Sequence, residues 1–149
     1  MISDLQFLLV GVVCYLGLLA GLIISLLSKE ELKPGRKYFV LLQHAILIVS
    51  LVIFLYSNEL NIFLVITLGA LLALLLALTS KVSQSIVAYP FMALFLSLSR
   101  YNSSLFFLLA ALAFLYGLPT ASLQMEKSYL KPFLLNLGFL VVLLISALV

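Results

Sequence analysis

The chain has 149 residues, of which 66% are apolar and only 9% are charged, and its mean hydropathy is +1.36. A soluble domain of this size could not cover so much apolar surface with water-compatible groups, so the composition excludes a soluble globular protein. The net charge of +3 comes from basic residues that flank apolar runs, which favours lipid headgroups over nucleic acid as the anionic partner.

Six apolar runs, separated by short loops, occupy almost all of the chain. They cover residues 5–27, 38–56, 62–79, 85–99, 104–121 and 132–149. Each has about the length that crosses a hydrocarbon core as an α-helix, at a rise of ~1.5 Å per residue. The loops leave no room for a second domain. The sequence therefore predicts an all-α polytopic membrane protein with a single domain over residues 1–149, in which six transmembrane helices form three helical hairpins.

Basic residues are distributed unevenly between the two sets of loops. Seven of the eight Lys and Arg residues flank the loops after the first, third and fifth runs, whereas the opposite side carries only Arg100. This bias predicts a multi-pass protein of the cell membrane with both termini outside. A cleaved signal peptide is the competing interpretation of the first run, but residues 1–6 lack the positive charge that such a peptide needs, and the run is long for its apolar core.

Small residues recur at four-residue spacing on the first, third and fifth runs. Gly17 and Gly21 lie on the first run, and Gly69 and Ala73 lie on the third. Such spacing lets helix backbones approach closely, so we expect these three helices to form the tight centre of the bundle. Two alternatives stay open: Gly17 and Gly21 could join two copies of the chain, and the recurring pattern could reflect a threefold internal repeat.

Proline marks two irregular places along the chain. Residues 33–36 have the Pro-Gly order of a type II turn, which predicts a compact turn in the first cytoplasmic loop. Gly117 and Pro119 lie inside the fifth run and form a candidate hinge, because proline removes a backbone donor and should kink or end the helix just before it. The alternative is a separate piece over residues 120–129 along the cytoplasmic interface, with polar residues such as Gln124 facing water.

Polar residues inside the runs gather in the cytoplasmic half of the predicted bundle. Arg36 and Gln43 begin a polar stripe of period seven on the second predicted helix, and His44 lies beside it. Asn136 on the sixth run lies at a comparable depth. Such a stripe is unfavourable against lipid, so Arg36, Gln43, His44 and Asn136 form a candidate polar pocket that faces the cytoplasm. The alternative is that Gln43, His44 and Asn136 hydrogen-bond one another or backbone carbonyls and thereby join helices.

The chain carries no pattern for catalysis or for a bound cofactor. It has one His, one Cys, and no Asp or Glu inside an apolar run. Ion-coupled transport usually needs carboxylates within the membrane, and a catalytic site needs converging activated groups. We therefore expect no cofactor or metal ion, and a non-enzymatic scaffold or accessory subunit that contacts another membrane protein or its own copy. The alternative hypothesis is a small carrier for an organic or lipidic substrate, which would use the polar pocket and the hinge.

Overall fold

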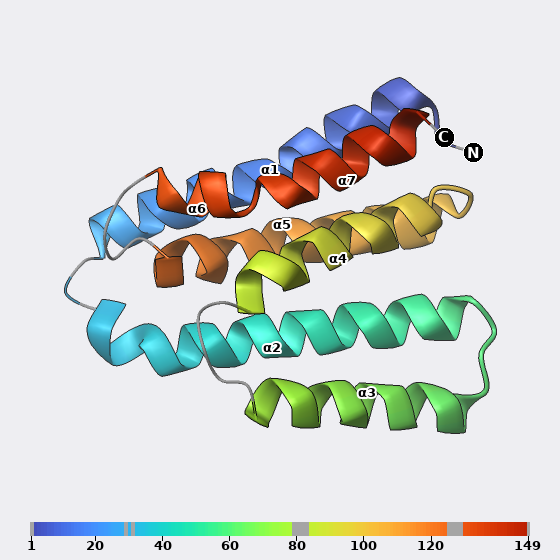
Figure 1. The fold of residues 1–149 in the computed structure, drawn as a ribbon, viewed down its shortest axis with the longest axis horizontal. Helices are drawn as coiled ribbons and strands as arrows, with labels where there is room; N and C mark the ends of the chain where they lie inside the picture. The colour runs from blue at the N-terminus through green and yellow to red at the C-terminus, as the bar shows by residue number, and fades with distance from the viewer. Residues whose placement is uncertain (1, 29, 31, 79–83, 125–129, 149) are drawn as a thin grey trace.

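The computed structural model describes residues 2–28, 30, 32–78, 84–124 and 130–148 of the chain. No strand occurs among these residues and 89% of them are helical, so contacts between helices define the whole fold. The helices are α1 (Asp4–Leu27), α2 (Leu32–Ser57), α3 (Ile62–Leu78), α4 (Gln84–Leu98), α5 (Ser103–Gln124), α6 (Lys131–Leu135) and α7 (Leu137–Leu148). The chain runs back and forth along one direction, and both termini lie at the same end of the molecule (Figure 1).

Three of these helices are long and apolar enough to cross a membrane. They are α1, α2 from Pro34 onward, and α5. Shorter apolar stretches cover Ile62–Leu72, Ala88–Leu98 and Leu137–Leu148, within the third, fourth and sixth predicted runs. The prediction of an all-helical protein built from apolar helices is confirmed for the described residues.

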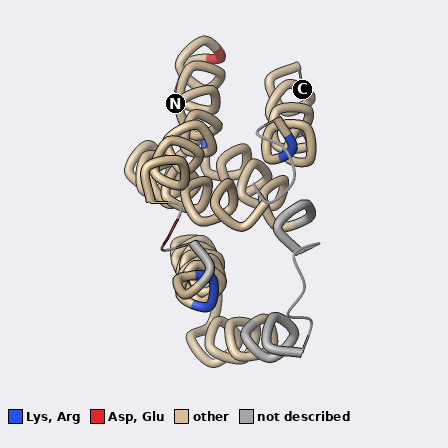
Figure 2. Tube along the Cα trace, turned by 90° about the vertical axis from the view of Figure 1, so that its left-hand side faces the viewer, with Lys and Arg blue, Asp and Glu red and all other residues tan. Residues whose placement is uncertain are grey.

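The central helix of the bundle is α5, which packs against α1, α2 and α4. Figure 1 shows α1 and α7 on one side of α5, and α2 with α3 on the other. The helix α3 makes its extensive contacts with α2 alone and lies at the edge, as the end view in Figure 2 also shows. The expectation that the third run shares the tight centre is therefore wrong. Of the α3 residues whose burial the structure describes, only Val65 and Gly69 are buried, because α3 packs extensively against α2 alone.

The helix α1 buries one face against α5. Its buried residues recur every three or four positions, as expected of a helix with one packed face: Phe7, Gly11, Cys14, Gly17, Leu18, Gly21 and Ser25. The helix begins with a capping box, in which the Ser3 hydroxyl accepts from the Gln6 backbone N–H and the Gln6 side chain accepts from the Ser3 N–H, each at 3.3 Å. The residues at the start of α1 and the spacing of its buried residues therefore specify where the helix begins and which face it buries.

Backbones touch where α1 crosses α5. A Cβ atom at Gly17 would fall well inside contact distance of the Phe114 carbonyl oxygen, and one at Gly21 would lie 2.8 Å from the Leu118 Cα atom. A Cβ atom at Gly117 would lie 2.8 Å from the carbonyl carbon of Gly17. The face of α1 that could have joined two copies of the chain is thus occupied by α5 of the same chain.

The predicted type II turn at residues 33–36 is wrong, because α2 already begins at Leu32 and these residues are helical. No described glycine has a positive φ, which a type II turn would require. Proline is tolerated in the first turn of a helix, where a backbone N–H would have no intrahelical acceptor in any case. Among the described non-glycine residues, only Glu59 has a positive φ, at 58°, two residues after the end of α2.

The helix α5 continues through Pro119 to Gln124, so an end of the helix before the proline is wrong, as is the alternative of a separate piece that begins at residue 120. A kink at the candidate hinge of Gly117 and Pro119 stays a prediction. Side chains bond the carbonyls near the proline: Thr120 Oγ1 donates to the Tyr116 carbonyl at 2.7 Å, and Ser122 Oγ donates to the Leu118 carbonyl at 3.1 Å. These two bonds give additional partners to carbonyls in the turns around the proline. Gln124 is only 2% exposed and does not face outward, while residues 125–129 lie outside the described part.

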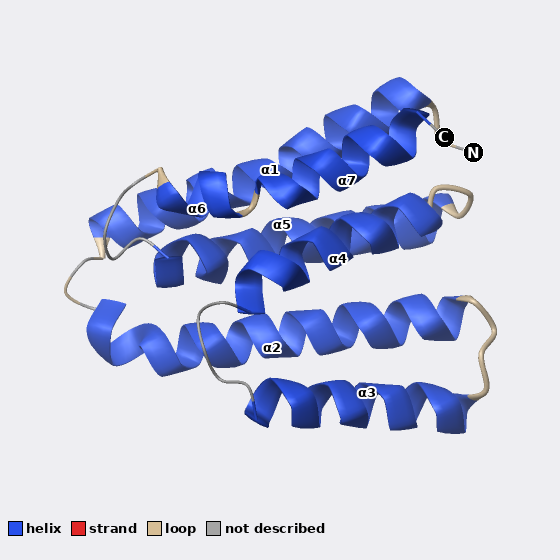
Figure 3. Ribbon diagram, viewed as in Figure 1, coloured by secondary structure: helices blue, strands red, loops and turns tan. Residues whose placement is uncertain are grey.

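The sixth apolar run is divided into two helices, which the sequence did not indicate. A short non-helical turn at Asn136 separates α6 from α7, as Figure 3 shows. The Asn136 N–H bonds to the Phe133 carbonyl at 3.2 Å, and the Phe139 N–H bonds to the Asn136 carbonyl at 3.0 Å. Both bonds span three residues instead of four, so the helix is tightened at this point rather than unwound.

Candidate functional site

Two of the four residues in the predicted polar pocket bond to the same helix, α5. Gln43 Nε2 donates to Thr120 Oγ1 at 2.7 Å, and Asn136 Nδ2 donates to Gln124 Oε1 at 2.8 Å. Both residues are buried, with exposed fractions of 6% for Gln43 and 0% for Asn136. Because Thr120 and Gln124 are four residues apart, both bonds reach one face of α5 on consecutive turns.

The other two residues of the predicted pocket are more accessible. Arg36 is exposed in the second turn of α2, and His44 is half-buried beside Gln43. In contrast to Gln43 and Asn136, neither is enclosed by the bundle. Of the predicted packing residues, Gly69 faces the Val52 side chain, whose Cγ2 would lie 3.3 Å from an added Cβ atom, and the side chain of Ala73 lies outside the described part.

A third bond ties α1 to the same segment of α5. The Ser25 hydroxyl donates to Ser122 Oγ at 2.7 Å, and both side chains are buried. We call the six residues joined by these three bonds the polar cluster: Ser25, Gln43, Thr120, Ser122, Gln124 and Asn136. The last turns of α5 therefore hold α1, α2 and the α6–α7 turn together.

Hydroxyl and amide groups make up the whole polar cluster. These groups neither gain nor lose a proton near neutral pH, so they can position helices or bind a polar molecule but cannot act as acids or bases. Within the described residues, no group of three or more His, Cys, Asp or Glu side chains could hold a metal ion. The chemistry available to the cluster is hydrogen bonding.

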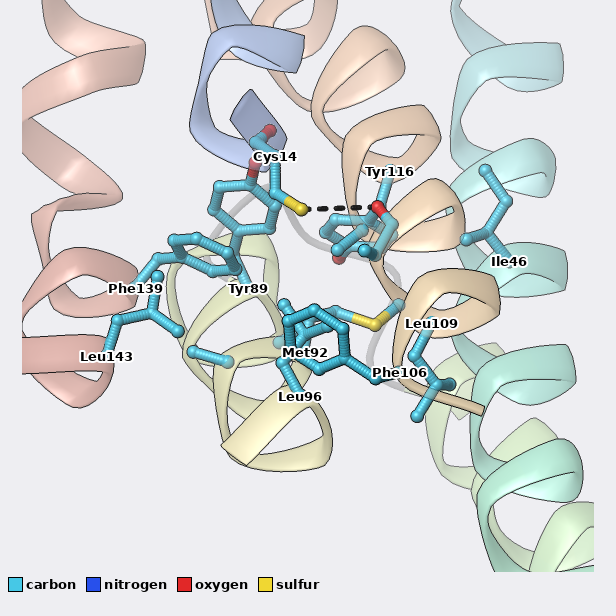
Figure 4. Close-up of a cluster of buried hydrophobic side chains, with 14 of the residues drawn as sticks. Cys14, Ile46, Tyr89, Met92, Leu96, Phe106, Leu109, Tyr116, Phe139 and Leu143 are labelled. Atoms are coloured by element: carbon cyan, nitrogen blue, oxygen red, sulfur yellow. Dashed lines mark hydrogen bonds between the residues drawn. The ribbon is translucent and has the colours of Figure 1, made fainter. Parts of the chain in front are cut away.

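An aromatic core lies next to the polar cluster. The Tyr89 ring stacks on Phe139 with centroids 4.5 Å apart and on Tyr116 at 5.7 Å, as Figure 4 shows. The Tyr89 hydroxyl donates to the Cys14 carbonyl at 2.9 Å, and the Cys14 thiol contacts the Ala110 carbonyl at 3.3 Å. The thiol is thereby enclosed among helices as a packing group.

The hydroxyl of Tyr15 links α1 to α6. It donates to the Phe133 carbonyl at 2.7 Å, and its ring lies 6.1 Å from the Phe133 ring, centroid to centroid. A tyrosine so deep in the first apolar run needs an internal hydrogen-bond acceptor, and this carbonyl provides it. Sequence reasoning did not find the central role of Tyr89, because a tyrosine before a proline carries no signal of which helices will surround it.

The end of the molecule that contains both termini carries one charged contact. Arg100 forms an ion pair with Asp4, and its Nε donates to the Ile2 carbonyl at 3.3 Å. Its guanidinium also lies over the Phe7 ring, 5.4 Å from the centroid. Arg100 is the one basic residue on the side that carries few Lys and Arg residues, and its charge is neutralised by Asp4.

Comparisons with protein-family models, with curated proteins and with solved structures give no match for this chain. Its function has to be argued from its own residues.

Proposed function

We propose that the chain is a non-enzymatic protein of the cell membrane, a small scaffold or accessory subunit that acts through helix contacts within the bilayer. One observation carries this proposal: the buried polar side chains that could have lined a substrate pocket are used to join helices. Gln43 bonds to Thr120, and Asn136 bonds to Gln124. A carrier needs polar groups directed at a substrate near the middle of the membrane, and these two amides are directed at α5.

We propose six passes through the membrane, with both termini outside. The three long helices support this topology by length and composition, and the alternating direction of the helices in Figure 1 agrees with it. Figure 2 looks onto the end opposite the termini, where the described basic residues of α2 and α6 lie. The shorter apolar stretches of α3, α4 and α7 can be accommodated because a bilayer thins locally around short spans.

The outer surface of the bundle is suited to contact with lipid, and with another membrane protein or a second copy of the chain. Large apolar side chains are exposed on every long helix, for example Leu9 at 57%, Leu41 at 66% and Phe107 at 57%. Exposed apolar area of this extent is unfavourable in water but favourable against lipid tails or a partner helix. The basic end is complementary to anionic lipid headgroups.

The proposal is tested by purifying the tagged chain in lipid nanodiscs and measuring the mass of the particle and the thermal stability of the protein. For a scaffold, we expect a stoichiometric complex with one partner, or with a second copy, that survives in folded Gln43→Leu and Asn136→Leu variants. We also expect no lipid or metabolite to raise the melting temperature by the RT ln(1 + [L]/Kd) that specific binding requires.

The carrier makes the opposite prediction. A substrate that stabilises the wild-type chain, and loses this effect in folded Gln43→Leu and Asn136→Leu variants, would contradict the scaffold. Ser50→Ala is the matched control, because the buried Ser50 hydroxyl bonds only within its own helix, to the Ile46 carbonyl at 2.7 Å. Its effect on ligand binding should be nil under either hypothesis.

A further inference from the structure

The side chain of Asn136 is completely enclosed at the turn between α6 and α7, with an exposed fraction of 0%. Its two amide hydrogens are both used. Nδ2 donates to Gln124 Oε1 at 2.8 Å and to the Pro132 carbonyl at 2.6 Å. The amide oxygen Oδ1 is buried and has no hydrogen-bond partner in the described part of the structure.

The orientation of this amide is fixed by its neighbours. Exchanging its oxygen and nitrogen would place Oδ1 against two acceptors, Gln124 Oε1 and the Pro132 carbonyl. The Gln124 amide could turn in response, but a backbone carbonyl cannot. The unpartnered atom is therefore an acceptor, and a buried acceptor without a partner is unfavourable, most of all in an apolar surrounding.

Hydrogen-bond donors that also need a partner lie close by in the chain. The helix α7 begins at Leu137, directly after Asn136, and the first N–H groups of a helix have no acceptor within it. The Phe139 N–H bonds to the Asn136 carbonyl, which leaves the N–H groups of Leu137 and Gly138. Gly138 has no side chain that could accept from them. The Pro90 ring, whose Cγ would lie 3.0 Å from a Cβ atom at Gly138, has no N–H to offer to Oδ1.

We propose that this turn binds one water molecule, which donates a hydrogen bond to Asn136 Oδ1 and accepts one from the N–H group of Leu137 or Gly138 at the start of α7. A metal cation fits poorly, because it needs several oxygen ligands and the nearby Phe133 carbonyl already accepts from Tyr15 and from the Asn136 N–H. An anion would be repelled by Oδ1. Water both donates and accepts, and ordered water commonly satisfies buried groups where an apolar helix is interrupted.

The site is tested on the wild-type chain, labelled with ¹⁵N at asparagine and glutamine and held in lipid nanodiscs. We expect the Asn136 side-chain amide to show cross-peaks to water of opposite sign in NOESY and ROESY spectra, the signature of bound rather than exchanging water. The Gln43 amide is the matched control, because it is also buried and bonds to Thr120. It should show no such cross-peak.

The assignment of the NMR signal to the Asn136 amide does not depend on a single variant. Asn136→Leu should remove the signal, and if that protein does not fold, Ser substitutions of the exposed Asn58, Asn61 and Asn102 identify the remaining asparagine by elimination. A missing water cross-peak at Asn136 would overturn the proposal. So would a cross-peak to lipid or to another protein group in its place.

Discussion

At the residue scale, each side chain of the polar cluster forms one hydrogen bond with another member of the cluster on a different element of the fold. Hydrogen bonds between helices in membranes contribute modestly, about 0.6 kcal/mol on average and up to ~1.7 kcal/mol. Their contribution to specificity is larger, because each bond fixes the register of two helices whose remaining contacts are apolar and could slide. The cluster on α5 therefore determines which neighbours occupy which face.

The bond between Gln43 and Thr120 should appear as an energetic coupling. We expect Gln43→Leu and Thr120→Val to be non-additive in the free energy of unfolding by about 0.6 to 1.7 kcal/mol, measured by denaturation in mixed micelles. Ser50→Ala combined with Thr120→Val is the control, because Ser50 bonds to its own helix, and this pair should be additive. Additive effects for Gln43 and Thr120 would show that the bond does not stabilise the bundle.

The glycines at the α1–α5 crossing should not tolerate even a methyl group. We expect Gly21→Ala to lower the free energy of unfolding by about 1 to 3 kcal/mol, because the new atom meets the Leu118 backbone, which cannot rotate away. Gly69→Ala is the matched control. It meets only the Val52 side chain at 3.3 Å, and the better helix propensity of Ala, up to ~1 kcal/mol, offsets that contact. Equal effects of the two substitutions would contradict the close approach of α1 and α5.

Sequence reasoning found Gln43 and Asn136 as the polar positions on their helices, because a polar residue within an apolar run stands out. It did not find their partners. Thr120 is 77 positions from Gln43, and spacing along one helix carries no information about which face of another helix it will meet. The alternative of a separate piece after Pro119 also placed Gln124 beyond the fifth run and facing water, so its bond to Asn136 was not expected.

At the element scale, the position of each helix depends on how many of its faces can form close contacts with other helices. The helix α5 has small residues on one face and polar residues near its end, so it supports three neighbours. The helix α3 has the same small-residue spacing, but Gly69 meets a side chain rather than a backbone. Spacing of small residues alone therefore does not identify a central helix.

The five-residue helix α6 is too short to be stable by itself and depends on contacts with other helices. We expect Tyr15→Phe, which removes the bond to the Phe133 carbonyl, to speed hydrogen exchange of the α6 amides while those of α7 stay unchanged. Exchange measured by mass spectrometry in nanodiscs reports this directly. Tyr38→Phe is the control, because the Tyr38 side chain is 64% exposed. Unchanged exchange in α6 would mean that the Tyr15 bond does not anchor it.

At the scale of the whole molecule, charge separates the two ends. Along the sequence, seven basic and three acidic residues lie in or beside the connections α1–α2, α3–α4 and α5–α6, a net of four positive charges. The described basic residues of α2 and α6 among them lie at the end opposite the termini. The opposite end carries Arg100 with Asp4 and Glu59, and Arg100 is neutralised by its ion pair with Asp4. This separation can be read from the sequence, because the Lys and Arg bias is a property of loops and does not depend on which helices touch, and the topology inferred from it stays a prediction.

The central claim is that the chain crosses the membrane six times with both termini outside, and site-directed cysteine labelling of intact cells tests it most directly. Single cysteines are introduced in a Cys14→Ala background at positions in each connection: Ser28, Asn58, Ser83, Asn102 and Ser128. An impermeant maleimide added outside should label cysteines at Asn58 and Asn102, and should reach those at Ser28, Ser83 and Ser128 only after the cells are opened. Labelling of the latter three in intact cells, or protection of either of the first two, would contradict the six-pass topology.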